Sequence, residues 1–224
     1  MRVRSVLAFL TVLVAVTGCG SSSVPSPPSG VDELVIPTPS PDPADFVAGV
    51  DNPWFPLQPG STRTYDVSDA RGHHALTVIT APGPEIAGVR TTSEVSREQG
   101  EVVTDWYAQD VDGNVWWFGR EGEWQAGADG AEAGVAMLAT PRVGDGYRLA
   151  YQPGVVEDIA RVDALDGRTT VPAGTYDGLL LTEQRSALVV GTARDLSYAH
   201  GVGLVEEAVV AGDYRTVRLV SVRD

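Results

Sequence analysis

Short runs of β-branched and aromatic residues recur along this 224-residue chain, and glycine, proline or Asp-Gly turn signals separate them. No stretch shows the 3.6-residue apolar periodicity of a long amphipathic helix. Short strands joined by tight turns are typical of an antiparallel all-β domain. We predict strands over residues 61–68, 75–81, 89–98, 102–110, 114–120, 147–151, 159–165, 176–185, 196–199, 203–210 and 214–222.

We expect these strands to form a single strongly curved antiparallel sheet or an incomplete barrel, because curvature lets one sheet cover its own core. A β-sandwich is the alternative architecture. The least strand-like region is 122–141, in which we predict a short helix or an irregular loop over 131–138. Connections of this length in compact domains often serve a function, for example as lids.

The clearest predicted hairpin spans residues 105–118, where aromatic runs flank an Asp-Gly-Asn turn. Glycine and asparagine tolerate the positive φ that such a turn requires. Alternation along the second strand places Trp116 and Phe118 on one face and Trp117 on the other. Both faces are therefore apolar, which predicts a strand that is central in the sheet or covered by another layer.

Four tryptophans and a tyrosine lie within 19 positions: Trp106, Tyr107, Trp116, Trp117 and Trp124. Aromatic side chains dominate the burial of protein cores, so these residues could form the main core. On the concave face of a curved sheet, they could instead line a pocket for an apolar ligand. Both interpretations stay open at this point.

The segment from Asp110 to Asn114 resembles the start of a calcium loop, but its glycine follows the second acid directly, so we predict a turn. His73 and His74 are adjacent on a strand and point to opposite faces, which makes joint chelation of one metal difficult. The chain lacks a Gly-x-Ser-x-Gly nucleophile elbow. We therefore predict no metal, no cofactor and no enzymatic activity, with a small envelope hydrolase as the alternative.

The first 18 residues have the layout of a secretory signal peptide. Arg2 and Arg4 precede an apolar run that is too short to span a membrane and that ends just before Cys19, the sole cysteine. The sequence Val-Thr-Gly-Cys at 16–19 resembles the lipobox of bacterial lipoproteins. The resemblance implies cleavage before Cys19, a diacylglyceryl thioether on its sulfur and acylation of the new amino group.

Residues 19–45 form a proline- and serine-rich tether behind Cys19, in which we expect disorder, and residues 46–224 form one β-rich extracytoplasmic domain. Loss of Arg2 and Arg4 with the leader changes the formal charge from −14 to −16. Such an acidic surface argues against nucleic acid as a partner.

Four motifs occur in order along the domain: Asp-Asn-Pro-Trp-Phe-Pro-Leu-Gln-Pro-Gly at 51–60, the hairpin at 105–119, Val-Pro-Ala-Gly-Thr-Tyr at 171–176, and Tyr-Ala-His-Gly-Val-Gly-Leu-Val at 198–205. Together they resemble a family of uncharacterised lipoproteins and secreted proteins from actinobacteria. His200 stands where that family more often has proline, and Trp117 where it more often has tyrosine. The resemblance implies no catalytic residue.

We expect a lipoprotein that Cys19 anchors to the outer face of the cell membrane and that acts as a binding or structural module of the envelope. Besides the membrane, its expected partner is a hydrophobic small molecule in the concavity of the sheet, or an envelope protein. A protein-interaction module is a further alternative to the hydrolase. The sequence does not indicate an oligomeric state.

Overall fold

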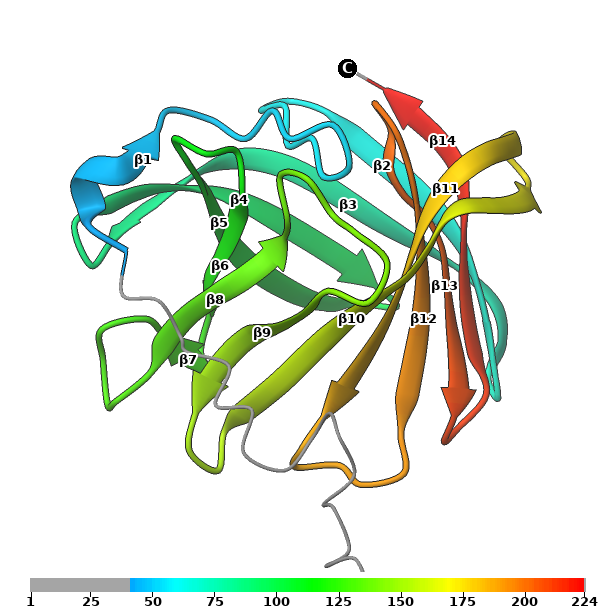
Figure 1. Ribbon diagram of the computed structural model, residues 1–224. Coiled ribbons are helices and arrows are strands. Elements are labelled where there is room, and N and C mark those ends of the chain that lie inside the picture. Colours follow the sequence, from blue (N-terminus) through cyan, green and yellow to red (C-terminus); the bar gives the residue numbers. More distant parts are fainter. Residues whose placement is uncertain (1–40, 224) are drawn as a thin grey trace, which may run out of the picture. The chain divides into compact units, whose positions relative to one another are not determined.

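The computed structural model describes residues 41–223, and these residues are almost entirely β-strand (Figure 1). A 3-10 turn, η1 (Pro43–Asp45), precedes the strands. The strands are β1 Phe46–Val47, β2 Thr62–Asp69, β3 Gly72–Ile86, β4 Val89–Glu98, β5 Glu101–Asp110, β6 Val115–Arg120, β7 Trp124–Gln125, β8 Glu132–Met137, β9 Gly146–Gln152, β10 Val156–Val171, β11 Gly174–Ser186, β12 Ala193–Ala199, β13 Gly203–Ala211 and β14 Arg215–Arg223.

Within residues 41–223, no helix has the length and hydrophobicity needed to cross a membrane. The predicted signal peptide, Cys19 and most of the tether lie outside the described residues.

The strands form an antiparallel meander that closes on itself. From β2 to β6 and from β8 to β14 each strand pairs with the next one along the chain, and β6 pairs with β8. The ring is completed where β14 pairs with β2, from Arg215 opposite Asp69 to Arg223 opposite Thr62. The prediction of a strongly curved antiparallel sheet is confirmed, and the sheet closes fully into a barrel of 12 strands.

Alternation of residue type explains which side chains point inward. Along β2, burial alternates with every second residue: Arg63, Tyr65 and Val67 are buried, and the residues between them are half-buried. A pleated strand sends successive side chains to opposite faces, so the buried set faces the interior of the closed sheet.

Strand β8 corrects a sequence-based prediction, because residues 131–138 form neither a helix nor an irregular loop. Most of β8 is buried on both faces. It pairs with β6, where Val135 lies opposite Trp116 and Gly134 opposite Trp117. Its alanines and glycine have low intrinsic strand propensity, so tertiary pairing decides the conformation here.

The outer face of β6 is covered by a further strand. Phe46 of β1 makes edge contacts with Trp116 and Phe118, at ring-centroid distances of 6.2 and 5.2 Å. Trp117 lies on the other face and contacts Tyr107. The structure thus confirms the alternation that was predicted for this strand. It also confirms that another layer covers the strand, as its two apolar faces indicated.

Segment 51–57 is fastened across one end of the barrel by two amide side chains. The Gln109 Oε1 atom accepts hydrogen bonds from the backbone N–H groups of Asp51 and Asn52, at 2.9 and 2.8 Å. The buried Asn52 amide donates to the carbonyl oxygens of Gly113 and Leu138. These bonds hold the following residues, including Phe55, against the barrel interior.

Candidate functional site in the barrel interior

The barrel encloses a cavity of about 220 Å³. Five aromatic side chains from separate parts of the chain line it: Phe55 from segment 51–57, Tyr65 from β2, Tyr107 from β5, Trp117 from β6 and Tyr198 from β12. Phe55 contacts Tyr107 at 5.1 Å and Tyr198 at 6.3 Å between ring centroids. The interior is therefore hollow, with one largely aromatic wall.

An ion pair forms another part of the lining. The Arg63 guanidinium donates to Glu94 Oε1 at 2.7 Å and also to the carbonyl oxygen of Pro56. The two side chains are only 7% and 15% exposed. Burial raises the pKa of the Glu94 carboxyl despite the opposing effect of Arg63, so the carboxylate depends on its partner to stay charged.

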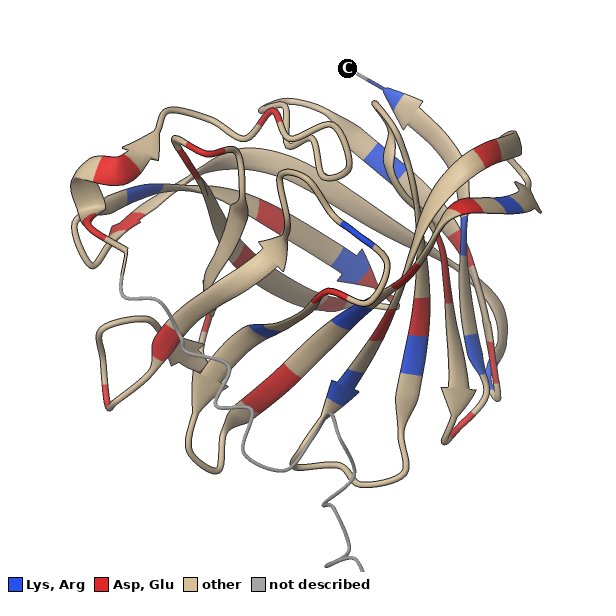
Figure 2. Ribbon diagram, viewed as in Figure 1, with Lys and Arg blue, Asp and Glu red and all other residues tan. Residues whose placement is uncertain are grey.

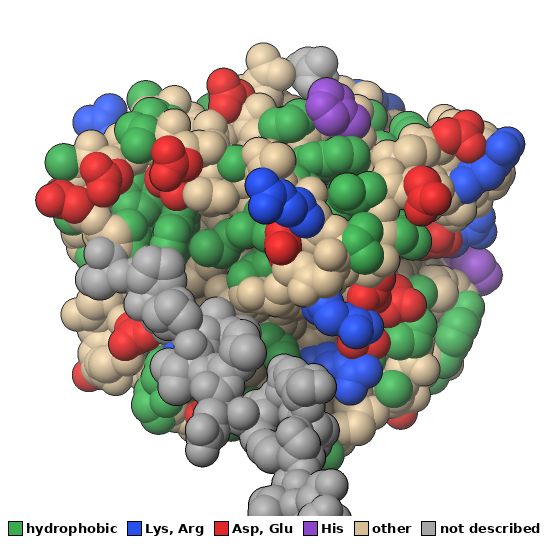
Figure 3. Space-filling model, in the orientation of Figure 1, with side chains coloured by type: hydrophobic (Ala, Val, Ile, Leu, Met, Phe, Trp, Pro, Cys, Tyr) green, Lys and Arg blue, Asp and Glu red, His purple; other side chains and the backbone are tan. Residues whose placement is uncertain are grey.

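A second, more open cavity of about 650 Å³ lies at the barrel mouth, where the β2–β3, β11–β12 and β13–β14 connections meet. Gln184, Arg194 and Arg215 line both this cavity and the interior one. The two cavities therefore adjoin at these three side chains. Acidic and basic residues lie on neighbouring strands that lead to this end (Figure 2). Basic side chains at the lower right of Figure 3 lie against acidic ones.

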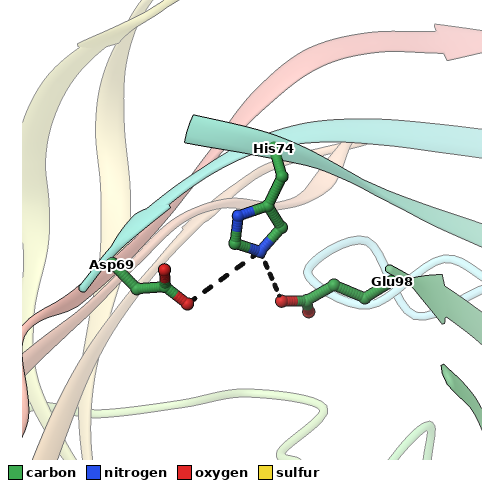
Figure 4. Close-up of side chains that lie close together, drawn as sticks. All are labelled: Asp69, His74 and Glu98. Atoms are coloured by element: carbon green, nitrogen blue, oxygen red, sulfur yellow. Dashed lines mark hydrogen bonds and ion pairs between the residues drawn. The ribbon is translucent and has the colours of Figure 1, made fainter. Parts of the chain in front are cut away.

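Near the mouth, β2, β3 and β4 bring together Asp69, His74 and Glu98 (Figure 4). His74 Nε2 lies 2.7 Å from Glu98 Oε1 and 3.9 Å from Asp69 Oδ2. Arg215 makes a two-pronged contact with Glu98, at 2.9 and 2.7 Å. Hydrogen bonds from Arg215, and then from His74, lower the pKa of Glu98 to about 2.

The ligand atoms of Asp69, His74 and Glu98 lie within 4.8 Å of one another, a spacing that a metal ion could use. However, Arg71 donates to Asp69 at 2.8 Å, and Arg215 and His74 occupy the oxygens of Glu98. Cations already neutralise both carboxylates, so we interpret the group as a charge network that ties three strands together. Sequence analysis missed it because its members meet only through strand pairing.

Acid should weaken this network. The folded-state pKa of Glu98 lies below its unfolded value of about 4.3, so its contribution is present above that pH and lost as pH falls toward 2. We expect Glu98→Gln to lower the free energy of unfolding by about 1–3 kcal/mol near pH 7 and by about half as much near pH 3. Urea unfolding at both pH values measures this difference.

Glu101→Gln provides the matched control, because Glu101 lies opposite Glu98 at the same turn and is exposed. We expect little change in stability for this control at either pH. A loss for Glu98→Gln that is equally large near pH 3 would contradict the assigned role of the Glu98 charge.

Of the five aromatic residues singled out in the sequence, the cavity lining includes Tyr107 and Trp117. Trp124 packs edge-on against Trp117, at 5.0 Å between ring centroids. Trp106 and Trp116 lie outside the lining: Trp106 covers Gly119, and the indole N–H of Trp116 donates to Asp110 Oδ2 at 2.8 Å. The cluster is thus divided between the cavity wall and the packed core.

The segment from Asp110 to Asn114 is a turn, as predicted. Asp110 Oδ1 accepts a hydrogen bond from the backbone N–H of Asn114 at 2.8 Å. Asp110 Oδ2 accepts from the Asn114 side-chain amide and from Trp116. Both carboxylate oxygens therefore serve the hairpin itself.

No protein-family model matches this chain, and no curated protein matches it. Among solved structures, it is similar to a Bacteroides fragilis protein described as exported, with a YmcC-like fold. That match has 14% identity and a TM-score of 0.47, and it covers 76% of this chain and 99% of the other. A protein of Parabacteroides distasonis described as a lipoprotein matches with 13% identity and a TM-score of 0.35, over 76% and 98% of the two chains.

Proposed function

We propose that this protein is a lipid-anchored extracytoplasmic binding protein that holds a small amphipathic molecule in its barrel. The observation that carries the proposal is the hollow interior, which has an aromatic wall inside and polar side chains at its mouth. Ligand sites in proteins are typically apolar cavities with a few placed polar groups. This arrangement suits a molecule that buries an apolar part and leaves a polar group at the mouth.

The volume of the interior cavity limits the size of the buried part. At about 30 Å³ per water molecule in the liquid, 220 Å³ corresponds to roughly seven water-sized units. A short hydrocarbon chain or a single ring fits this space. The volume therefore supports a short buried part for the expected hydrophobic small molecule, and the polar side chains at the mouth support an amphipathic one.

The sequence supports the proposed lipid anchor at Cys19. The lipobox-like Val-Thr-Gly-Cys and the proline-rich residues behind Cys19 suit a domain tethered to a membrane. We expect Cys19→Ala to release the protein from the membrane fraction or to block its processing. Fractionation and mass spectrometry of the N-terminus measure both results, and a normally processed, membrane-bound variant would refute the anchor.

Binding can be tested on the full chain carrying Cys19→Ala, so that no detergent is needed. Octanoate and octan-1-ol serve as probes because each joins a short chain to one polar group. We expect at least one of them to bind by calorimetry with a Kd of about 1 mM or lower, a value typical of weak small-molecule sites. Organic extracts of the purified protein, analysed by mass spectrometry, should contain a small amphipathic compound.

A variant that fills the cavity locates the binding. Ala136 is buried in the lining, so Ala136→Phe should abolish binding of both probes. Val222→Phe adds a comparable ring near the end of β14 at a side chain that is 42% exposed, and it should bind as the parent does. The proposed function would be overturned if neither probe binds to the parent protein and the organic extracts contain no amphipathic compound.

An exposed apolar loop favours protein interaction as a second candidate function. Residues 186–193 contain no charged side chain, and Leu188, Val189 and Val190 are 42%, 53% and 93% exposed. Exposed apolar patches often mark interaction sites. A photoreactive residue at position 190 should then cross-link to an envelope protein in intact cells, and labelling of lipid alone would count against this candidate.

The hydrolase alternative has less support. His74 and Glu98 form the carboxylate–histidine pair that such an enzyme could use, but neither side chain is among the residues that line the two cavities. Arg215 also holds Glu98 in a bidentate contact. The pair is therefore better suited to bracing the barrel wall than to moving a proton on a substrate.

A further inference from the structure

Six arginines line the two cavities, and five of them have a close acidic partner. These five are Arg63, Arg71, Arg120, Arg185 and Arg215. Each has a carboxylate oxygen within 2.9 Å, from Glu94, Asp69, Asp105, Glu183 and Glu98 respectively. Their charges are therefore largely neutralised inside the protein.

Arg194 differs from the other five. Its acidic partner, Glu207, lies 3.7 Å from Nη1, beyond hydrogen-bond distance. Its hydrogen bond runs from Nη2 to the neutral Gln184 side chain, at 3.1 Å. A guanidinium carries five N–H donors, so most of the capacity of Arg194 is left for another acceptor.

The position of Arg194 would let its remaining N–H groups contact a ligand in the cavity. Arg194 and Gln184 lie where the interior cavity meets the mouth cavity, and the Arg194 side chain is 44% exposed. A molecule whose apolar part occupies the aromatic interior would place its polar end at these two side chains. Arginine is well suited to this role because its planar fork binds carboxylates in a bidentate manner.

We infer that Arg194, assisted by Gln184, binds the singly charged carboxylate of a small amphipathic ligand. This inference rests on the proposed function and names the class of ligand. One incompletely neutralised cation matches one negative charge. Glu207 lines the interior cavity beside Arg194 and would repel the second charge of a dianion such as a phosphate monoester.

The test compares two probes of equal chain length, octanoate and neutral octan-1-ol, on the Cys19→Ala full chain. We expect octanoate to bind about 10- to 100-fold more tightly, the range for a hydrogen-bonded charge. Arg194→Gln should reduce octanoate affinity to that of octan-1-ol and leave octan-1-ol affinity unchanged. Arg194→Lys should retain part of the preference for octanoate.

Arg185→Gln is the matched control, because Arg185 lines the mouth cavity but is paired with Glu183 at 2.8 Å. It should bind both probes as the parent does. Equal affinity of the parent for both probes would overturn the carboxylate inference and leave the proposed cavity function intact. An octanoate preference that survives Arg194→Gln would remove Arg194 from the site. Failure of both probes to bind, together with organic extracts that contain no amphipathic compound, would overturn the proposed function and this inference together.

Discussion

Replacement of Arg63 by methionine should lower the free energy of unfolding by about 3–5 kcal/mol, the usual cost of removing one partner of a buried ion pair. The Glu94 carboxylate would stay in the barrel interior without a counter-charge, because its side chain is only 15% exposed. The carbonyl oxygen of Pro56 would also lose the donor that Arg63 provides. Equilibrium unfolding in urea measures the change.

A double variant separates the loss of the pair from the loss of packing. Arg63→Met combined with Glu94→Leu replaces both charges with apolar groups, and such replacements are often neutral or stabilising. We therefore expect the double variant to recover most of the stability. The penalty of the single variant should also shrink at acid pH, where Glu94 can take up a proton. A loss below about 1 kcal/mol would show that the pair is effectively solvated.

Gly134→Ala should be comparably harmful for a steric reason. A Cβ at this position would lie 2.4 Å from the Arg148 carbonyl oxygen and 2.5 Å from the carbonyl carbon and oxygen of Leu149. These are backbone atoms of β9, which cannot move aside as a flexible side chain could. We expect a loss of about 3 kcal/mol or more, equivalent to a fall in Tm of roughly 6–12 °C for a domain of this size.

Gly146→Ala provides the control for this steric prediction. Gly146 lies at the start of β9, and the nearest atom to a Cβ there would be the Ala160 carbonyl oxygen at 3.9 Å. We expect a change within about 0.5 kcal/mol, as for other harmless substitutions. Thermal unfolding of Gly134→Ala and Gly146→Ala measures the difference, and equal Tm values for the two variants would contradict the prediction.

Local sequence signals were sufficient to predict the strands and turns that depend only on neighbouring residues. The Asp-Gly-Asn turn and its flanking aromatic residues predicted the β5–β6 hairpin, because Gly113 supplies the positive φ and Asp110 caps the turn. Strand β4 was predicted with its observed bounds. In contrast, β3 extends to Ile86, past Pro82 and Pro84, through an irregular pairing with β4 that no local pattern indicates.

The candidate site was only partly predictable. Alternation along β6 could indicate that Trp117 faces away from Trp116, but not that the space beside Trp117 is empty. A cavity depends on how twelve strands tilt and close, and closure rests on pairing between β2 and β14 at opposite ends of the domain. Likewise, Arg194 resembles any other surface arginine in the sequence, and its distance from Glu207 depends on how β12 and β13 lie together.

The sequence by itself determined that this domain is all-β and antiparallel, because turn residues and strand alternation act over a few neighbouring positions. It also contains the lipobox-like Val-Thr-Gly-Cys at 16–19, a motif that contiguous residues alone define. Only the tertiary structure decided that the meander closes around a hollow interior and that five of six cavity arginines are closely paired. Both features come from strands that meet through long-range hydrogen bonding, and no local pattern encodes their spacing.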